Sequence, residues 1–218
     1  MNRRIEKILS LPKSIYANIK LFGWKGLKIP ILIRYDVKLI RLTRGSVSLD
    51  DFSSCKIIYG FGGTDSILDR KSSLDLIKGS KMIFHGDAQF SRGTILKNKG
   101  IIELGDHFSA NKNFTISCSK RISFGENCLL GWDVYMRDSD GHEIMDKETH
   151  ESKPIIGEVN IGNHVWIASF CHILKGTVVP SGCVVGYKSL VCRRFIEPDC
   201  IIAGHPAAVT RHNIEWIL

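Results

Sequence analysis

Residues 161–196 read IGNHVW IASFCH ILKGTV VPSGCV VGYKSL VCRRFI, which are six consecutive hexads with one internal pattern. The first position of each hexad is β-branched and aliphatic: Ile161, Ile167, Ile173, Val179, Val185 and Val191. The fifth position is mostly small or of medium size: Val165, Cys171, Thr177, Cys183, Ser189 and Phe195. A period of six fits neither the three- and four-residue spacing of a helix nor the alternation of a simple strand. It indicates short, flat strands joined by tight turns, with three strands to a triangular coil and a narrow aliphatic interior.

The same rhythm continues upstream with interruptions. Six further hexads precede residue 137, namely FHGDAQ, FSRGTI, LGDHFS, ANKNFT, FGENCL and LGWDVY. Insertions of two residues near 100–103 and 120–123 shift the register, and before residue 80 the pattern fades. The largest break is residues 137–154, which begin RDSDGHEI. Because coils bury their faces only by stacking on one another, this break predicts a loop that protrudes from the stack.

Composition and cysteine usage narrow the class of protein. The 218 residues are 44% hydrophobic and 24% charged, as in an ordinary soluble protein. No apolar run approaches the ~18–20 residues that a membrane-spanning helix needs, and no signal peptide is recognisable. The seven cysteines form no CxxC pair, which argues against a disulfide framework and against a zinc site. We therefore expect a cytoplasmic protein.

Positive charge is concentrated at the N-terminus. Residues 1–44 hold 11 Lys/Arg against Glu6 and Asp36, a balance of +9, so the remainder of the +8 chain carries −1. Such a segment either packs on a neighbour or touches an anionic membrane, which would place the protein at the inner face of that membrane. It lacks a nucleic-acid-binding motif, so we expect no nucleic-acid partner. Apolar residues at 5, 8, 9 and 11 predict a short amphipathic helix that ends before Pro12.

Four motifs resemble the hexapeptide-repeat acyltransferases. They are FSANKNFTI (108–116), ISFGENCLLGWDV (122–134), IGNHVWIASFCHILKGTVV (161–179) and the closing turn AGHPAAV (203–209). The resemblance covers roughly 80–212 and implies an all-β, left-handed parallel β-helix, whereas general crossover rules favour the right-handed form. It divides the chain into a basic N-terminal segment (1–45), a β-helix domain (46–212) with loop 137–154, and a tail (213–218). The DSDGH loop and the C-terminal NIEWI are most similar to enzymes that O-acetylate cell-surface polysaccharides or their sugar precursors, and galactoside and maltose acetyltransferases share the coil at 108–116.

The interruption holds the candidate catalytic residues. A neutral imidazole accepts a proton near pH 7, and a loop on a rigid scaffold is a common place for such a group. The resemblance matches His142 to the family's catalytic histidine, a general base. Asp140 orients its ring in this interpretation, although Asp138 is also close enough in the sequence and both aspartates fit a turn. Asn111 matches an asparagine that contacts the acetyl donor and the acceptor, and its alternative is a corner residue with a left-handed backbone.

The resemblance also implies a binding path for coenzyme A. Trp166 walls the thioester end, and the backbone N–H groups of Ala168 and Ser169 serve the donor carbonyl or the pantetheine arm. Arginine suits phosphate groups because charge-assisted hydrogen bonds are strong. The residues matched to the remainder of the pantetheine path and to the phosphates are Gly186, Tyr187, Lys188, Arg193, with Arg194 as its alternative, and Arg211.

These features together predict an acetyl-CoA-dependent O-acetyltransferase. His142 deprotonates a sugar hydroxyl of a cell-surface polysaccharide or its precursor, and the hydroxyl attacks the thioester directly. The family forms homotrimers with CoA in the groove between neighbouring β-helices, so a trimer is expected. Ser119 stands where some sugar acetyltransferases carry an acidic residue, which disfavours galactoside or maltose as the acceptor.

Three alternatives differ in chemistry. An N-acetyltransferase of an amino sugar or other amine, and a non-catalytic CoA-binding scaffold, both stay open. Zinc catalysis on the same fold needs three histidine ligands. It is disfavoured here, because the only histidine close to His164 in the sequence is His172, at a spacing of eight residues. No metal is expected, and no GxGxxG or P-loop spacing supports nucleotide chemistry.

Overall fold

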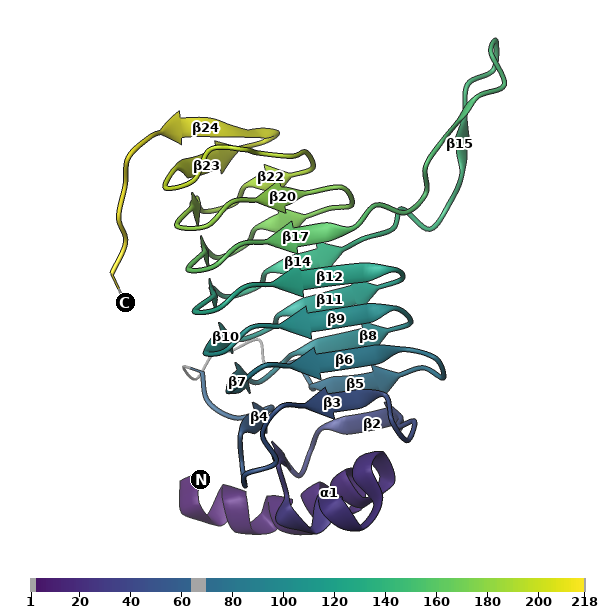
Figure 1. Ribbon diagram of the computed structural model, residues 1–218, viewed down its shortest axis with the longest axis vertical. Helices are drawn as coiled ribbons and strands as arrows, with labels where there is room; N and C mark the ends of the chain where they lie inside the picture. The colour runs from purple at the N-terminus through teal and green to yellow at the C-terminus, as the bar shows by residue number, and fades with distance from the viewer. Residues whose placement is uncertain (1–2, 64–69, 218) are drawn as a thin grey trace.

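In the computed structural model, which describes residues 3–63 and 70–217, parallel strands stack into the three faces of a left-handed β-helix (Figure 1). The first sheet contains β1 (Ile31–Ile33), β4 (Ile57–Tyr59), β7 (Ala88–Phe90), β10 (Phe108–Ala110), β13 (Leu129–Leu130), β18 (Trp166–Ile167), β21 (Val184–Val185), β23 (Ile201–Gly204) and the antiparallel β24 (Ala207–Arg211). The second contains β2 (Lys38–Arg41), β5 (Ser73–Leu76), β8 (Ile95–Asn98), β11 (Thr115–Cys118), β14 (Tyr135–Arg137), β19 (His172–Ile173) and β22 (Leu190–Val191). The third contains β3 (Val47–Leu49), β6 (Lys81–Phe84), β9 (Ile101–Leu104), β12 (Arg121–Phe124), β17 (Val159–Ile161) and β20 (Val178–Val179). The predicted fold class is confirmed.

The six-residue period is the period of the core. Leu130, Ile167 and Val185 are paired in successive coils of the first sheet, and all three are fully buried. Because each first-position side chain packs on the one in the next coil, the interior is a continuous aliphatic column. The cysteines at fifth positions are also interior, and burial raises the pKa of the Cys128 thiol to about 11. Such protonated thiols act as small apolar side chains, as the sequence predicts.

The strands extend further toward the N-terminus than the repeat does in the sequence. The period fades before residue 80, whereas β1 at Ile31–Ile33 already pairs in parallel with β4. Aromatic side chains occupy the interior of the middle coils, where the Phe108 ring lies 5.3 Å from that of Phe90 and 4.9 Å from that of Phe124. Before residue 80 the core stays mostly aliphatic, but the length of chain between paired residues is irregular: Ile31 pairs with Ile57 and Ile57 with Ala88, 26 and 31 residues along the chain, whereas Ile167 pairs with Val185, 18 residues along. Unequal coil lengths therefore hide the repeat in the sequence without ending the stack.

Residues 138–157 leave the stack as a projecting arm (Figure 1). Its outer part is a two-stranded antiparallel hairpin of β15 (Ile144–Met145) and β16 (Ser152–Lys153), and the side chains of both strands are exposed. The arm therefore matches the protruding loop that the broken rhythm predicts at 137–154.

Helix α1 (Arg3–Phe22) lies across the N-terminal end of the stack and is followed by the 3-10 turn η1 (Gly23–Lys28) (Figure 1). The prediction that the helix ends before Pro12 is wrong, since Pro12 lies inside it. Proline removes the N–H that would bond the carbonyl of Ile8. Both residues are exposed, so water can solvate that carbonyl, and contacts beyond Pro12 hold the second half of the helix in place.

Those contacts are hydrogen bonds between α1 and the open edge of β1. Asn18 Oδ1 accepts from the N–H of Ile31 at 3.1 Å, and Asn18 Nδ2 donates to the Ile31 carbonyl at 2.7 Å. Ser14 Oγ accepts from the N–H of Ile33 at 2.9 Å. Four helical residues advance about 6 Å and two strand residues about 6.6 Å, so every fourth helix position meets every second strand position. The helix thus covers a strand edge that would otherwise be open to pairing.

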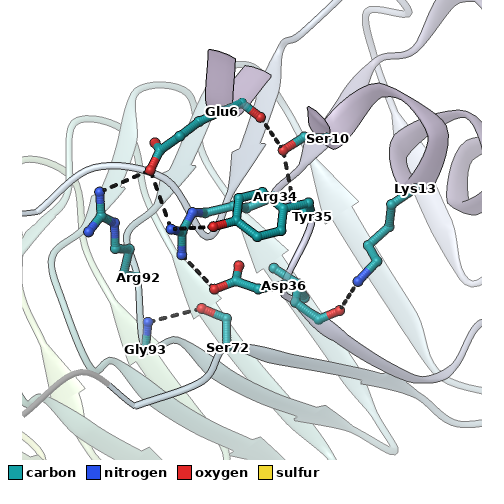
Figure 2. Close-up of polar contacts among 10 residues, drawn as sticks. Glu6, Ser10, Lys13, Arg34, Tyr35, Asp36, Ser72, Arg92 and Gly93 are labelled. Atoms are coloured by element: carbon teal, nitrogen blue, oxygen red, sulfur yellow. Dashed lines mark hydrogen bonds and ion pairs between the residues drawn. The ribbon is translucent and has the colours of Figure 1, made fainter. Parts of the chain in front are cut away.

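A buried ion-pair cluster fixes the start of α1 (Figure 2). The carboxylate of Glu6, which is only 4% exposed, lies 3.3 Å from Arg34 Nη2 and 3.4 Å from Arg92 Nη2. Arg34 also pairs with Asp36 at 2.6 Å. Glu6 thus ties the helix to residues of two coils. Residues 1–2 of the predicted N-terminal segment and residue 218 of the predicted tail lie outside the described residues.

The described part of the chain contains no helix that is both long and apolar enough to cross a membrane.

Candidate functional site

The arm begins at Asp138, whose carboxylate is fully buried. It accepts hydrogen bonds from the backbone N–H groups of Ser119 at 2.7 Å, Lys120 at 2.6 Å and Arg121 at 2.9 Å. The carbonyl of Asp138 in turn accepts from the N–H of Gly157, where the arm returns. Asp138 therefore closes the base of the arm and fixes the turn of the coil beneath it. This carboxylate is engaged in structure and is not directed at His142.

Asp140 is held by the next coil. Its carboxylate lies 2.6 Å from Lys175 Nζ, and its N–H donates to the carbonyl of Ile155 at 2.9 Å. Lys175 also donates to the carbonyl of Pro154. In the described residues the carboxylate of Asp140 is thus paired with Lys175, so its role as the group that orients His142 stays a prediction.

His142 lies just past the base of the arm and is exposed. Gly141 precedes it with φ of 84°, a left-handed backbone conformation that glycine adopts without steric cost. Arg137 donates to the carbonyl of Ser139 and steadies the same turn. The chain therefore presents an imidazole to solvent on a turn whose two sides are pinned to the β-helix.

Asn111 and the predicted pantetheine residues lie on one corner of the β-helix, between the first and second sheets. The coils are in register there: the N–H of Asn111 donates to the Leu130 carbonyl, that of Ala168 to Val185 and that of Gly186 to Ile202. The period of six therefore brings six predicted residues into one column: Asn111, Ala168, Ser169, Gly186, Tyr187 and Lys188.

Two expectations about this column change in detail. The Ala168 N–H donates to the Val185 carbonyl at 2.9 Å, so it belongs to the hydrogen bonding between coils and is not free for a donor carbonyl. The left-handed corner residue is Asn113, with φ of 63°, and not Asn111. Asp133, Phe170 and Lys188 occupy the same left-handed position in the other coils of the column. The asparagine at 111 is therefore not explained by backbone conformation.

Sequence reasoning missed two exposed aromatic residues in the column. Trp132 lies in the coil that follows the coil of Asn111, and its backbone N–H donates to Ser169 Oγ at 2.9 Å. The Phe170 ring packs edge-on against that of Tyr187, with centroids 5.5 Å apart. A signal was present, because both residues stand at turn positions of the hexads, where small or polar residues are usual. The corner thus carries an exposed aromatic strip beside Asn111.

Trp166 lies on the outer face of the first sheet, just before this corner. It is partly exposed, and its ring centroid is 6.1 Å from that of Trp216 in the C-terminal tail. Trp216 stacks on His164 at 4.1 Å, and its indole N–H donates to the His164 carbonyl. The tail therefore folds back over the first sheet and forms a wall next to Trp166.

The two predicted phosphate-binding arginines are in the last coil, on different sides of it. Arg193 follows β22 between the second and third sheets, and its Nε donates to the Ala207 carbonyl at 3.0 Å. Arg211 ends β24 and pairs with Ile201. A single chain therefore separates these arginines from one another. It also separates His142 from Asn111, because Asn111 precedes β11 and the arm follows β14, at opposite ends of two neighbouring strands.

One group of potential metal ligands occurs among the described residues: Glu197, Cys200 and His212, whose ligand atoms lie within 4.8 Å of one another. His212 Nδ1 lies 2.7 Å from Glu197 Oε2, a contact that accounts for the arrangement without a metal ion. Burial and the nearby Glu197 charge raise the pKa of the Cys200 thiol, which opposes the thiolate form that binds metals. The cluster lies in the last coil, away from the arm.

Comparisons with known proteins connect these features with sugar O-acetyltransferases. No protein-family model matches the chain. The chain is 31% identical over 127 residues to a polysialic acid O-acetyltransferase of Escherichia coli O1:K1, covering 57% of this chain and 41% of the relative. It is 39% identical over 106 residues to a polysialic acid O-acetyltransferase of Neisseria meningitidis (49% of each chain), and 31% identical over 110 residues to galactoside O-acetyltransferase of Escherichia coli K12 (50% and 53%). The chain thus spans about half the length of these curated relatives.

Two solved structures share the fold. The polysialic-acid-specific acetyltransferase NeuO superposes with a TM-score of 0.55 at 21% identity, over 86% of this chain and 74% of that one. The polysialic acid O-acetyltransferase OatWY gives a TM-score of 0.55 at 23% identity, over 84% and 90%. The resemblance inferred from the motifs is therefore confirmed: the chain is similar in sequence to sugar O-acetyltransferases and has the β-helix fold of two polysialic acid O-acetyltransferases.

Proposed function

We propose that this protein is an acetyl-CoA-dependent O-acetyltransferase that modifies a sugar hydroxyl of a cell-surface polysaccharide or its precursor. The observation that carries the proposal is the arm, because the long break in the hexad repeat after β14 presents an imidazole on a pinned turn. The sequence similarity to named sugar O-acetyltransferases supports the substrate class. The ordered column of residues that begins at Asn111 supports a binding path for acetyl-CoA along that corner.

His142 acts as the general base. A ring nitrogen accepts the proton of the sugar hydroxyl while the hydroxyl oxygen attacks the thioester carbonyl, and the proton then passes to the departing thiolate of CoA. Asn111 holds the acceptor and the acyl group in line, and Trp166 borders the thioester end. The attack is direct, because the cysteine beside the base of the arm is not a nucleophile: burial and the charge of Asp138 raise the pKa of Cys118 to about 12.

The site is composite and belongs to a homotrimer. Asn111 precedes β11 and His142 follows β14, so the two lie at opposite ends of neighbouring strands of the second sheet, and the arm projects away from its own stack (Figure 1). A neighbouring β-helix packed side by side would bring its own corner column to the arm. Acetyl-CoA would then lie in the groove between the two chains, where Arg193 and Arg211 can be supplied by different subunits. This arrangement explains why a single chain does not assemble the predicted site.

The test is release of CoA thiol from acetyl-CoA in the presence of a panel of sugars, oligosaccharides and amines. His142→Ala should lower the acceptor-dependent rate by about 10²-fold or more. His150→Ala is the matched control, because His150 is an exposed histidine on the same arm, and its rate should equal that of the wild type. Equal rates in all three proteins would contradict the role of His142. Turnover only with amines would support the N-acetyltransferase, and bound CoA without any turnover would support a scaffold.

A further inference from the structure

Helix α1 turns its apolar side away from the protein. The face that meets β1 and the coils is mainly polar or small: Glu6, Ser10, Ser14, Ala17, Asn18 and Leu21. The opposite face carries large apolar side chains that are exposed in the described structure: Ile5, Ile8, Leu9, Ile15, Tyr16 and Ile19. With the exposed Pro12 between Leu9 and Ile15, they follow a three- and four-residue spacing and make one stripe along the helix. The amphipathic helix predicted from the sequence is therefore present, but its apolar side does not face the core.

The stripe continues beyond the helix. In η1 the side chain of Trp24 is 85% exposed and that of Leu27 is also exposed. A hollow lined by Tyr16, Ile19 and Leu42 joins the stripe to the first coil. Monomeric proteins rarely expose a contiguous apolar surface of this kind unless another surface covers it.

Charge on and around the stripe identifies the covering surface. Residues 3–28 contain a single acidic residue, Glu6, which is buried in ion pairs with Arg34 and Arg92 (Figure 2). The same residues contain seven basic ones: Arg3, Arg4, Lys7, Lys13, Lys20, Lys25 and Lys28. An apolar stripe bordered by Lys and Arg, with a tryptophan at its edge, is the pattern of a helix that lies in a membrane interface. A second copy of the same face would bring like charges together, which opposes self-association.

We propose that the outward face of α1 and η1 docks this protein on an anionic membrane surface, with α1 lying in the plane of the interface. Ile8, Leu9 and Ile19 enter the headgroup–acyl boundary, and Trp24 lies at headgroup level. The exposed side chains of Lys20, Lys25 and Lys28 face anionic lipid phosphates and carboxylates, whereas Lys13 donates to the Val37 carbonyl of the protein itself.

This docking orients the whole molecule. Because α1 crosses the N-terminal end of the stack, the β-helix axis stands away from the membrane and the arm projects to one side of it (Figure 1). In the trimer of the proposed function, side-by-side β-helices would place three such helices in one plane, and binding would gain from multivalency. The docking itself does not depend on acyl transfer, so its failure and the failure of the proposed function are separate outcomes.

The experiment is co-sedimentation of the full chain with vesicles of phosphatidylcholine alone or of phosphatidylcholine with phosphatidylserine. The wild type should prefer the anionic vesicles by at least about tenfold, and added salt should reduce that preference. The double variant Ile8→Glu, Trp24→Glu should lose binding by about tenfold or more. Both side chains point away from the coils, so its thermal unfolding should match that of the wild type.

Two further variants keep the proposal falsifiable. Ile196→Glu is the matched control, because Ile196 is 89% exposed at the other end of the stack, and its vesicle binding should be unchanged. Lys20→Glu, Lys25→Glu should lose the preference for anionic vesicles while keeping the fold. No preference in the wild type, or an equal loss in Ile196→Glu, would overturn the proposal. Light scattering measures the oligomer size of each protein separately. A wild type that forms a larger oligomer than the Ile8→Glu, Trp24→Glu variant would also overturn the proposal, because a second copy of the chain would then cover the stripe.

Discussion

The coils at 161–196 and the arm at 138–157 are built on opposite principles. In the coils every sixth residue is buried against its counterpart one turn away, so the local repeat and the tertiary packing specify the same structure. In the arm nearly every side chain from Gly141 to Pro154 is exposed, and the hairpin is held mainly at its base. The difference shows how one chain separates tasks: the repeat supplies rigidity, and the interruption supplies reactive groups that need not contribute to stability.

The largest expected effect on stability comes from removing a core aromatic side chain. An exposed apolar side chain on the arm serves as the comparison. Phe108→Ala deletes a buried ring that packs on Phe90 and Phe124, so the free energy of unfolding should fall by about 3–5 kcal/mol. Ile144→Ala removes an exposed side chain of the arm and should change it by less than about 0.5 kcal/mol. Urea unfolding measures both. Similar losses in the two variants would break the distinction between frame and arm.

A smaller effect is expected at the junction of the two regions. Asp138→Ala leaves the backbone N–H groups at 119–121 without their acceptor, which should cost about 1–3 kcal/mol of unfolding free energy. Asp140→Ala is the control, because its partly exposed ion pair with Lys175 is worth about 0–1 kcal/mol. Urea unfolding of the two variants checks this order. Asp138→Ala that is as stable as Asp140→Ala would show that the arm is not anchored through Asp138.

The smallest effect is a pH dependence within the coils. His85 Nδ1 lies 2.8 Å from Asp50 and Nε2 lies 2.9 Å from Glu103, and these carboxylates, Glu103 first, raise the pKa of His85 above its ordinary 6.5. A raised folded pKa stabilises the protein fully below the unfolded pKa, and the stabilisation is lost as the pH rises through the folded value.

The comparison that checks this pH dependence uses His85→Gln. Between about pH 5.5 and 8.5, the unfolding temperature of the wild type should exceed that of the variant most at the acid end, and the two should converge toward the alkaline end. The ring is largely exposed, so the difference should be small. A gap that widens as the pH rises would contradict the assignment.

The fold could be predicted from the sequence where burial is periodic. Ile167 and Val185 repeat at a fixed spacing, and that spacing alone implies their contact. The same register predicts that Asn111, Ser169 and Tyr187 share a corner. The start of the stack near Ile31 was hidden, because unequal lengths of chain separate the paired residues there: Ile31 pairs with Ile57, and Ile57 with Ala88.

The rest depends on contacts between distant segments. Ser10, Ser14 and Asn18 are polar at every fourth position, which is typical of a solvent-facing side, and only the open edge of β1 explains why they are buried. Likewise the sequence places Asp140 two residues before His142, whereas the next coil of the β-helix brings Lys175 to that carboxylate. A local sequence pattern does not contain the position of such a partner.

The most direct test of the separation between frame and arm is to measure turnover and thermal unfolding on the same preparation of His142→Ala. We predict that acceptor-dependent thiol release from acetyl-CoA falls by about 10²-fold or more while the unfolding temperature stays at the wild-type value. Turnover that survives the substitution would contradict the claim that the arm supplies the base. A loss of turnover accompanied by an equal loss of stability would show instead that the arm is part of the frame.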